Sequence, residues 1–170
     1  MLRSRVPAYI PPERGYEATF SDWENKVKGP YPLQMYNKHY WRRSHTEFDN
    51  ILQLREAFPQ PFVMNPIDAE ARGIQTGDIV RVTSSEGSAI RPAVVTERIM
   101  PGVTFMPHGA WVEYDESQDV DKAGSDNYLE AGVPTVEGHS GFNSQIVQVE
   151  KWYGPDLAPD ARWPQRIVSV

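Results

Sequence analysis

The stretch FVMNPIDAEARGIQTGDIVRVTSSEG, residues 62–87, decides the fold of this chain. It opens with a short apolar run at 62–64 and closes with a second strand-like run at 79–83. The residues between these runs carry start and stop signals of a helix, followed by a tight turn at 76–78. The stretch therefore predicts a strand, a short helix, a turn and a second strand, in that order.

The helix signals are specific. Asn65 is placed as the N-cap, Pro66 lies at the first helical position, and Asp68 lies at N3, where a carboxylate meets free N–H groups. Gly73 supplies a left-handed residue at the helix end, and Ile74 supplies the apolar contact that follows it. Such a capped helix start after a strand can hold a polar ligand. From these residues alone, a capping role for Asn65 and Asp68 is the simpler explanation.

Length and composition set the class of protein. A chain of 170 residues can bury one good core, so we expect one domain with an attached arm. The absence of cysteine excludes disulfides, thiolate metal sites, iron–sulfur ligation and a cysteine nucleophile within this sequence. No apolar run reaches membrane-spanning length, which predicts a soluble chain.

Charge is divided unevenly along the chain. Residues 1–45 hold eight Lys and Arg against four Asp and Glu, out of totals of 17 and 23, so residues 46–170 hold nine against nineteen. The basic segment also carries eight of the nineteen aromatic residues. An acidic body argues against a general nucleic-acid surface, and the basic segment suits a single anionic ligand or an acidic neighbouring surface.

The N-terminal third predicts an arm followed by a cluster of donors. Residues 1–38 have little periodicity and many prolines and glycines, which indicates an extended arm whose aromatic side chains the body or a missing partner covers. Two guanidinium groups, two hydroxyls and an imidazole follow within residues 42–46, as pyrophosphate recognition requires. A solvated basic turn is the alternative. Residues 48–58 then predict a short helix that Pro59 ends.

The remaining segments favour β-structure. Residues 79–96 predict a β-hairpin, residues 103–106 another strand, and residues 145–150 a closing strand. The acidic stretch 113–141 predicts a long solvated loop, because it lacks the ligand spacing and central glycine of an EF-hand. Residues 153–170 predict a proline-rich tail. We therefore expect a mainly β domain of about six or seven strands with two short helices.

Motifs of self-contained catalysis are missing from the sequence. The histidines show no spacing typical of a metal site, and no Walker, G-x-G-x-x-G or G-x-S-x-G pattern occurs. A structural histidine and core packing are the simpler explanations for His108 and Trp111. The residues thus favour binding over catalysis, with an anionic ligand as the leading hypothesis.

Eight short motifs in a fixed order resemble a known family. They resemble the C-terminal molybdopterin-dinucleotide-binding domain of the dimethyl sulfoxide reductase family, with the greatest closeness to the catalytic subunits of anaerobic dimethyl sulfoxide and selenate reductases. The resemblance covers about residues 31–152. The motifs are YPLQ (31–34), HYWRRSHT (39–46), NPIDAEARGI (65–74), GDIVRV (77–82), MPGV (100–103), HGAW (108–111), DKAGSDNYL (121–129) and IVQVEKW (146–152).

The resemblance implies a fold and a cofactor. Members of the family close with a six-stranded double-psi β-barrel of the aspartate-decarboxylase type. They carry molybdenum or tungsten on two pyranopterin guanine dinucleotides. By resemblance, residues 1–38 are an arm, residues 39–152 the molybdopterin dinucleotide-binding barrel and residues 153–170 a tail. The expected function is to close over the cofactor, orient it and help tune its electronics.

The resemblance also implies contact residues. The segment that lines the pterin and pyrophosphate corresponds to Arg43, Ser44, His45 and Thr46. The strand-to-helix turn that meets a guanine corresponds to Asn65 and Asp68. Loop positions that approach the cofactor correspond to His108, Trp111, Asn127, Asn143 and Gln145.

The family's metal ligand and iron–sulfur cysteines lie in earlier domains, which this sequence does not contain. It therefore resembles one piece of a larger molybdopterin oxidoreductase, without a catalytic centre of its own. The implied partners are the remaining domains and an iron–sulfur electron-transfer subunit, with no nucleic acid or membrane contact. The parent enzyme is either exported to the outer face of the membrane or cytoplasmic. The alternative is a stand-alone double-psi barrel that serves as an interaction module.

Overall fold

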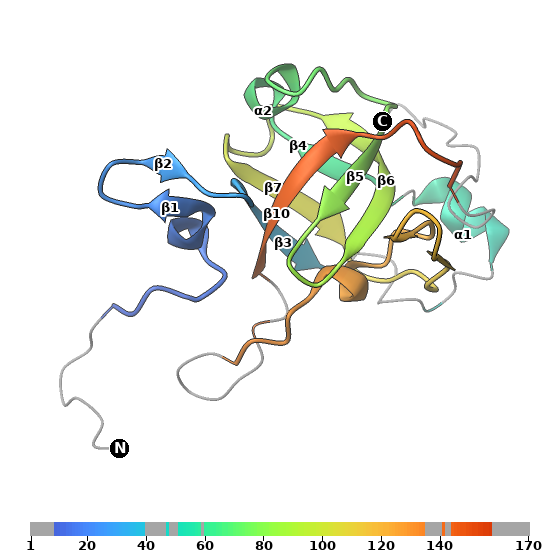
Figure 1. Ribbon diagram of the computed structural model, residues 1–170. Helices are drawn as coiled ribbons and strands as arrows, with labels where there is room; N and C mark the ends of the chain where they lie inside the picture. The colour runs from blue at the N-terminus through green and yellow to red at the C-terminus, as the bar shows by residue number, and fades with distance from the viewer. Residues whose placement is uncertain are drawn as a thin grey trace.

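The chain folds around one β-barrel in a computed structural model, which describes residues 9–39, 47, 51–58, 60–134, 141 and 144–157 (Figure 1). Within these residues the ordered elements are short. They are η1 (Tyr16–Thr19), β1 (Phe20–Asp22), β2 (Val27–Lys28), β3 (Leu33–Lys38), α1 (Leu52–Ala57), β4 (Phe62–Met64), α2 (Pro66–Glu70), β5 (Ile79–Thr83), β6 (Ser88–Val95), β7 (Val103–Pro107), β8 (Tyr114–Asp115), β9 (Val120–Asp121), η2 (Asp126–Leu129) and β10 (Ser144–Lys151).

Six strands close the barrel. Their order is β4-β7-β3-β10-β5-β6, and pairing of β4 with β6 completes the ring. The pairs β3–β7 and β4–β6 are parallel, and the other four are antiparallel. Strands β9 and β8 extend the sheet beyond β6. The expected mainly β fold with few helices is confirmed as a closed, mixed six-stranded barrel.

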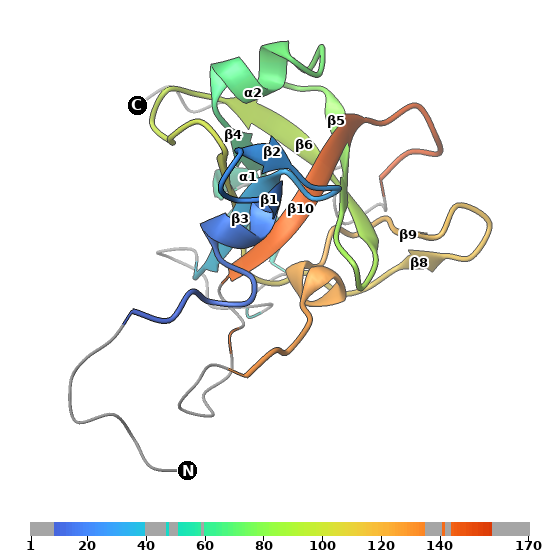
Figure 2. The same cartoon turned by 60° about the vertical axis from the view of Figure 1, so that its left-hand side comes forward.

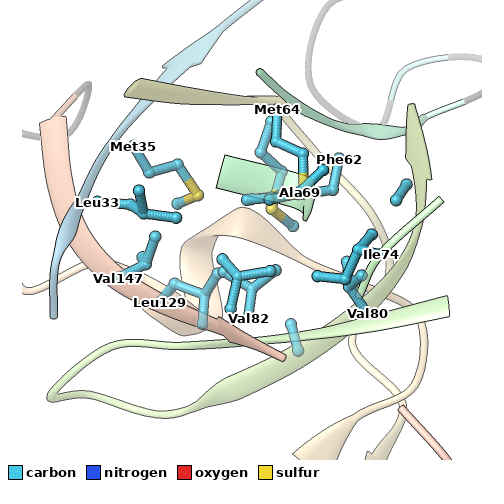
Figure 3. Packing of buried hydrophobic residues seen from close by; sticks show 14 residues of the cluster. Leu33, Met35, Phe62, Met64, Ala69, Ile74, Val80, Val82, Leu129 and Val147 are labelled. Carbon is cyan, nitrogen blue, oxygen red and sulfur yellow. The ribbon is translucent and has the colours of Figure 1, made fainter. Parts of the chain in front are cut away.

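Alternation along the strands fills the barrel with apolar side chains. In β3, Leu33 and Met35 point inward, and in β10 Val147 and Val149 do the same. Figure 3 shows these inward side chains meeting others from β4 and β5, with Leu129 of η2 among them. A buried Leu, Met or Phe side chain contributes roughly 1.5–3 kcal/mol. The barrel interior is therefore the main source of stability.

The stretch from residue 62 to residue 87 folds as predicted. The Asn65 side chain accepts a hydrogen bond from the Ile67 N–H at 2.9 Å, and Pro66 begins α2. At the other end Gly73 has φ +63°, and the Ile74 N–H reaches back to the Ala69 carbonyl at 2.9 Å. These are the bonds of a glycine-terminated helix, with Ile74 buried as the apolar contact.

The N-terminal segment contains a barrel strand that the sequence did not predict. Residues 33–38, within the segment expected as an arm, form β3 between β7 and β10. Before it, β1 and β2 make a small separate hairpin beside the barrel (Figure 1). Tyr16, Phe20 and Trp23 cluster edge to face on this hairpin, and the Tyr16 ring lies against Gly102. The barrel thus covers part of the aromatic surface.

Two other predictions needed correction. The stretch 113–141, expected to be a solvated loop, contains β8, β9 and η2. Its Asp121 and Asp126 are fully buried, because backbone N–H groups and a histidine satisfy them. The helix expected at 48–58 is described only from Leu52 to Ala57 as α1. The hairpin of β5 and β6 and the strands β7 and β10 are confirmed.

Two ends of the barrel carry different side chains. We call the end with α2 and the turn at Gly102 the α2 end, and the end where β3 and β7 finish and β10 starts the polar end. In Figures 1 and 2, α2 lies at the top of the barrel and η2 at the bottom. The five residues of β7 separate the ends by about 13 Å at 3.3 Å per residue. None of the described helices is long and apolar enough to span a membrane.

Candidate functional site

The polar end gathers buried polar side chains from four separate segments. β3 and β7 run parallel and finish together, with Lys38 paired to Pro107 and the His108 N–H bonded to the Lys38 carbonyl at 3.0 Å. Asn37 and Gln145 continue the inward-facing rows of β3 and β10 there. Buried polar groups require partners, and Asn37 finds one in Glu130, the residue after η2.

His108 and Asp126 form the centre of this end. Asp126 is fully buried, and His108 is 7% exposed. One carboxylate oxygen of Asp126 bonds to His108 Nδ1, and the other accepts the Gly109 N–H at 2.7 Å. Asp126 therefore fixes both the imidazole ring and the backbone after it, which leaves a defined orientation for the remaining ring nitrogen.

Glu130 completes a cluster with the same pair. Its Oε1 accepts a hydrogen bond from Asn37 Nδ2 at 2.7 Å. His108, Asp126 and Glu130 each place one nitrogen or oxygen within 4.8 Å of the others. Burial raises the pKa of Glu130 above its usual value, and the negative charge of Asp126 raises it as well. The hydrogen bond from Asn37 and the nearby His108 act in the opposite direction and lower this pKa.

Arg91 of β6 binds three of the chain segments that meet at the polar end. It is the largest fully buried side chain among the described residues, at 2% exposed. Its guanidinium donates to the carbonyls of Gly124, through Nε at 2.6 Å and also through Nη2, and of Gly109 at 3.0 Å. It also donates to the Gln60 carbonyl at 3.1 Å. The planar Arg91 guanidinium thus connects the segments before β4, after β7 and before η2.

Close packing keeps η2 in place. Gly124 has φ +73°, and a Cβ there would lie 2.7 Å from Arg91 Nε and from the Ile90 carbonyl. Next to it, Asp121 accepts the N–H groups of Glu113 at 2.7 Å, Ala123 at 3.1 Å and Ser125 at 2.6 Å. Three backbone donors on one buried carboxylate set the path of the chain into η2.

The structure brings four predicted contact residues to the polar end. His108 and Gln145 are buried there, whereas Asn127 of η2 is exposed and Trp111, in the loop after β7, is 68% exposed. The Gln145 side chain is 1% exposed, and its Oε1 has no hydrogen-bond partner within the described part of the chain. A buried amide oxygen in that state is costly unless something else donates to it.

Other predicted residues fall outside the described part. These are Arg43, Ser44, His45, Thr46 and Asn143. The last described residue before the first four is His39, which follows the end of β3; its ring centroid lies 5.0 Å from that of His108, with the two rings tilted by 50°.

Asn65 and Asp68 lie at the α2 end, on the opposite side of the barrel. Besides capping α2, Asn65 donates through Nδ2 to the Ile99 carbonyl at 2.7 Å. Asp68 was expected to meet the N–H groups of its own helix, but Oδ2 accepts the Gly102 N–H at 2.7 Å instead. The N3 position brings the carboxylate over the neighbouring turn, so these bonds join α2 to the start of β7.

The charge of Asp68 is already balanced by two cations. Burial lowers the pKa of Lys28, with Asp68 opposing this and Arg72 adding to it. Burial likewise lowers the pKa of Arg72, again opposed by Asp68. Lys28 and Arg72 therefore face the Asp68 carboxylate from the β1–β2 hairpin and from the end of α2.

Four residues of the polar end were missed by sequence reasoning: Asn37, Arg91, Asp126 and Glu130. An arginine in the middle of an otherwise apolar strand, at Arg91, was the one available signal, because such a residue needs buried acceptors. The spacing of the histidines could not reveal the cluster, since His108 and Asp126 are 18 residues apart and Asn37 and Glu130 are 93 apart.

Comparison with known proteins supplies a family. Residues 33–145 match the family described as the molydopterin dinucleotide binding domain. The chain is 42% identical over 149 residues to the probable dimethyl sulfoxide reductase chain YnfF of Escherichia coli K12, covering 86% of this chain and 18% of that one. It is 37% identical over 138 residues to dimethyl sulfoxide reductase DmsA of the same organism, covering 80% and 17%.

A third relative and a solved structure are also similar to this chain. Trimethylamine-N-oxide reductase of Salmonella typhi is 32% identical over 155 residues, covering 84% of this chain and 18% of that one. Acetylene hydratase from Pelobacter acetylenicus shares the fold with a TM-score of 0.68 at 17% identity, over 86% of this chain and 21% of that one. The chain thus spans about a fifth of the length of these proteins.

Proposed function

The chain belongs to the molybdopterin dinucleotide-binding domain family of dimethyl sulfoxide reductase-type oxidoreductases, and from this premise we propose that its polar end binds the cofactor. The ligand proposed is the guanine form, molybdopterin guanine dinucleotide. Its pterin and pyrophosphate would lie against the loop after β7, η2 and the start of β10. The observation that carries this proposal is the buried Gln145 Oε1, which has no hydrogen-bond partner among the described residues and lies at the same end of the barrel as the exposed Asn127.

The donor set of the polar end suits such a ligand. A pterin presents ring N–H and amino groups, which an amide oxygen such as Gln145 Oε1 can accept. Trp111 offers a flat indole and an N–H at the exposed rim, and Asn127 offers an amide. His108 is held in one orientation by Asp126. Together these groups fit a polar, planar ligand that carries phosphates.

The basic segment of the sequence adds to this end. Arg43 follows His39 by four residues, and four residues span at most about 14 Å. Arg43, Ser44, His45 and Thr46, together with Asn143, therefore belong to the proposed contact set. Arginine forks and hydroxyls are suited to the pyrophosphate.

Asn65 and Asp68 are proposed to hold the fold rather than the guanine. Their side chains are bonded at the α2 end, with both groups of the Asn65 amide already used. This favours the simpler of the two interpretations of the sequence, in which they are caps.

The chemistry belongs to the bound group: when present, the molybdenum or tungsten of the cofactor supplies electron transfer with the substrate. The residues of this chain bind and orient. Arg91 and Asp121 fix the loops, Gln145 and Asn127 hydrogen-bond to the ligand, and Trp111 covers it from solvent.

The chain is proposed to act as one domain of a longer oxidoreductase. It spans 18% of the length of its reductase relatives, which supports further domains that hold the metal, with an iron–sulfur electron-transfer subunit as a partner. We propose a double-psi topology for the barrel, supported by its two parallel pairs among six strands. The segment before Leu33 would act as an arm against the other domains, and residues 153–170 as a tail.

Nucleotide binding by the full chain tests this function. GDP carries the guanine and pyrophosphate of the cofactor, and GMP lacks the pyrophosphate, so calorimetric titration should give tighter binding for GDP. A matched pair of substitutions then locates the site: Gln145→Leu at the polar end and Gln75→Leu at the exposed α2 end. Released pterin cofactor should bind about five- to tenfold more weakly to Gln145→Leu, because one hydrogen bond is lost.

The stability of Gln145→Leu gives an independent check. Removing a buried amide oxygen that has no partner in the described part of the chain should leave thermal stability unchanged or slightly raised, while binding falls. If neither nucleotide nor pterin bound, or if Gln75→Leu weakened binding and Gln145→Leu did not, the proposed function would be wrong.

A further inference from the structure

The cluster of His108, Asp126 and Glu130 carries more acid–base groups than ligand positioning needs. We propose that these three side chains form a proton-binding site that shares at least one proton, and that anion binding at the polar end draws in a further proton from solvent. The first part stands on the cluster alone. The second part rests on the proposed function.

Two carboxylates beside one imidazole favour a shared proton. One nitrogen and two carboxylate oxygens lie within 4.8 Å of one another, and Asp126 is fully buried. With neutral imidazole and two ionised carboxylates, the cluster would hold two like charges in a site of low dielectric. A proton between His108 Nδ1 and Asp126, where the two atoms already make a hydrogen bond, removes one of these charges without moving any side chain.

Three neighbouring elements bring further charged or titratable groups toward the cluster. From β6, the Arg91 guanidinium donates to the carbonyls of Gly109 and Gly124. From β9, the Asp121 carboxylate is occupied by three backbone N–H groups. From the end of β3, the His39 ring lies with its centroid 5.0 Å from that of His108, tilted by 50°.

Glu130 is the member best placed to titrate. Glu130 is the residue after η2, and its side chain accepts a hydrogen bond from the uncharged amide of Asn37. Burial, the largest influence, raises its pKa, and the Asp126 charge acts in the same direction. Asn37 and His108 act in the opposite direction. The carboxyl of Glu130 therefore holds its proton to a higher pH than an exposed glutamate does.

An anion at the polar end shifts this equilibrium in a defined direction. Negative phosphate groups near the cluster favour its protonated form, so binding should take up protons from the buffer. By linkage, lowering the pH over the range in which the cluster titrates should strengthen binding by the same factor. In this proton uptake, only the bonds to the transferred proton form or break.

The first experiment uses the full chain without ligand. Carboxyl ¹³C shifts of glutamate are followed against pH in EDTA, with the Glu130 signal assigned by its loss in Glu130→Gln. Glu130 should titrate above the exposed Glu150. In His108→Gln the midpoint should rise further, because an opposing influence is removed, and in Asp126→Asn it should fall. A Glu130 midpoint equal to that of Glu150 and unmoved by both substitutions would overturn the inference.

The second experiment measures proton uptake. GDP is titrated calorimetrically into the full chain in PIPES and in Tris, whose ionisation heats differ. We expect uptake of a fraction of a proton for each GDP bound, reduced by at least half in Glu130→Gln and unchanged in Glu150→Gln. GDP binding without uptake would overturn the linkage and leave the proposed function intact. Absence of GDP binding would count against the proposed function, while the carboxyl titration would still decide the cluster.

Discussion

The two ends of the barrel use the same kinds of side chain for different purposes. At the α2 end, Asn65 caps its own helix and also donates to the Ile99 carbonyl, and Asp68 accepts the Gly102 N–H; these bonds hold α2 to the turn before β7. At the polar end, Arg91 and Asp126 tie together loops that are 17 to 33 residues apart in sequence. The α2 end is closed by its own bonds, and the polar end has the buried Gln145 oxygen still without a described partner.

The difference shows where a ligand site can arise. A helix cap such as Asn65 satisfies backbone groups and is itself satisfied, so little binding capacity is left over. At the polar end, one buried guanidinium and two buried carboxylates hold the loops in place. Burying such charged groups in a small barrel costs free energy. Preorganised loops of this kind are what binding a polar ligand requires. Three comparisons between the ends and one pH experiment can test this difference.

The largest effect is expected from the buried arginine. Arg91→Met removes all donors to the carbonyls of Gly124, Gly109 and Gln60, so unfolding in urea should show a loss of about 4 kcal/mol. The same change at the α2 end, Arg72→Met, removes one bond to the Asp68 carbonyl and should cost about 1 kcal/mol. Equal losses would mean that the two ends do not differ in this way.

Two left-handed glycines give the next comparison. Gly124→Ala places a methyl group 2.7 Å from Arg91 Nε and from the Ile90 carbonyl at φ +73°, so we expect a loss of about 3 kcal/mol. Gly73→Ala has φ +63° but no atom within 4 Å, and only the backbone penalty of about 1 kcal/mol remains. Thermal unfolding of both variants measures the difference, and a Gly73→Ala variant less stable than Gly124→Ala would contradict the packing described for η2.

Two asparagines separate folding from binding. Asn65→Ala removes the cap of α2 and should lower the unfolding free energy by about 1 kcal/mol, with GDP affinity unchanged. Asn127→Ala changes an exposed side chain of η2 and should leave stability within about 0.5 kcal/mol, while GDP affinity falls several-fold. The opposite pattern, with binding lost in Asn65→Ala alone, would move the ligand to the α2 end.

The smallest effect concerns pH. The pKa of Glu130 is raised in the folded chain, so the folded state holds more protons than the unfolded state between the two values. The stability that this contributes is present below the unfolded pKa and is lost as pH rises through the folded one. The free energy of unfolding, measured with a chemical denaturant between pH 4 and pH 8, should therefore fall more steeply with rising pH for the natural chain than for Glu130→Gln. Parallel curves would argue against a perturbed Glu130.

Local signals were enough to predict much of the α2 end. The cap at Asn65, the stop at Gly73 and the hairpin of β5 and β6 depend on residues a few positions apart, and all three were predicted correctly. The closed β-barrel agrees with the fold that the family resemblance implied. Strand β3 was missed because Asn37 faces inward where the alternation calls for an apolar residue. Its inward position makes sense only beside Glu130.

The polar end depends on contacts that no sequence pattern encodes. Asp126 was placed in a solvated loop, although it is buried against His108 and Gly109. Arg91 was assigned only to a strand, because the carbonyls that it binds belong to three other segments. Buried polar networks are specified by the tertiary arrangement, so the residues that hold a site are harder to predict than those that form a helix cap.

Mapping amide shifts of the full chain during titration with GDP tests the central claim most directly. The account predicts that changes concentrate on His108, Gly109, Asn127 and Gln145, with Asn65 to Asp68 unaffected. Changes centred on Asn65 to Asp68, with the polar end unaffected, would contradict it.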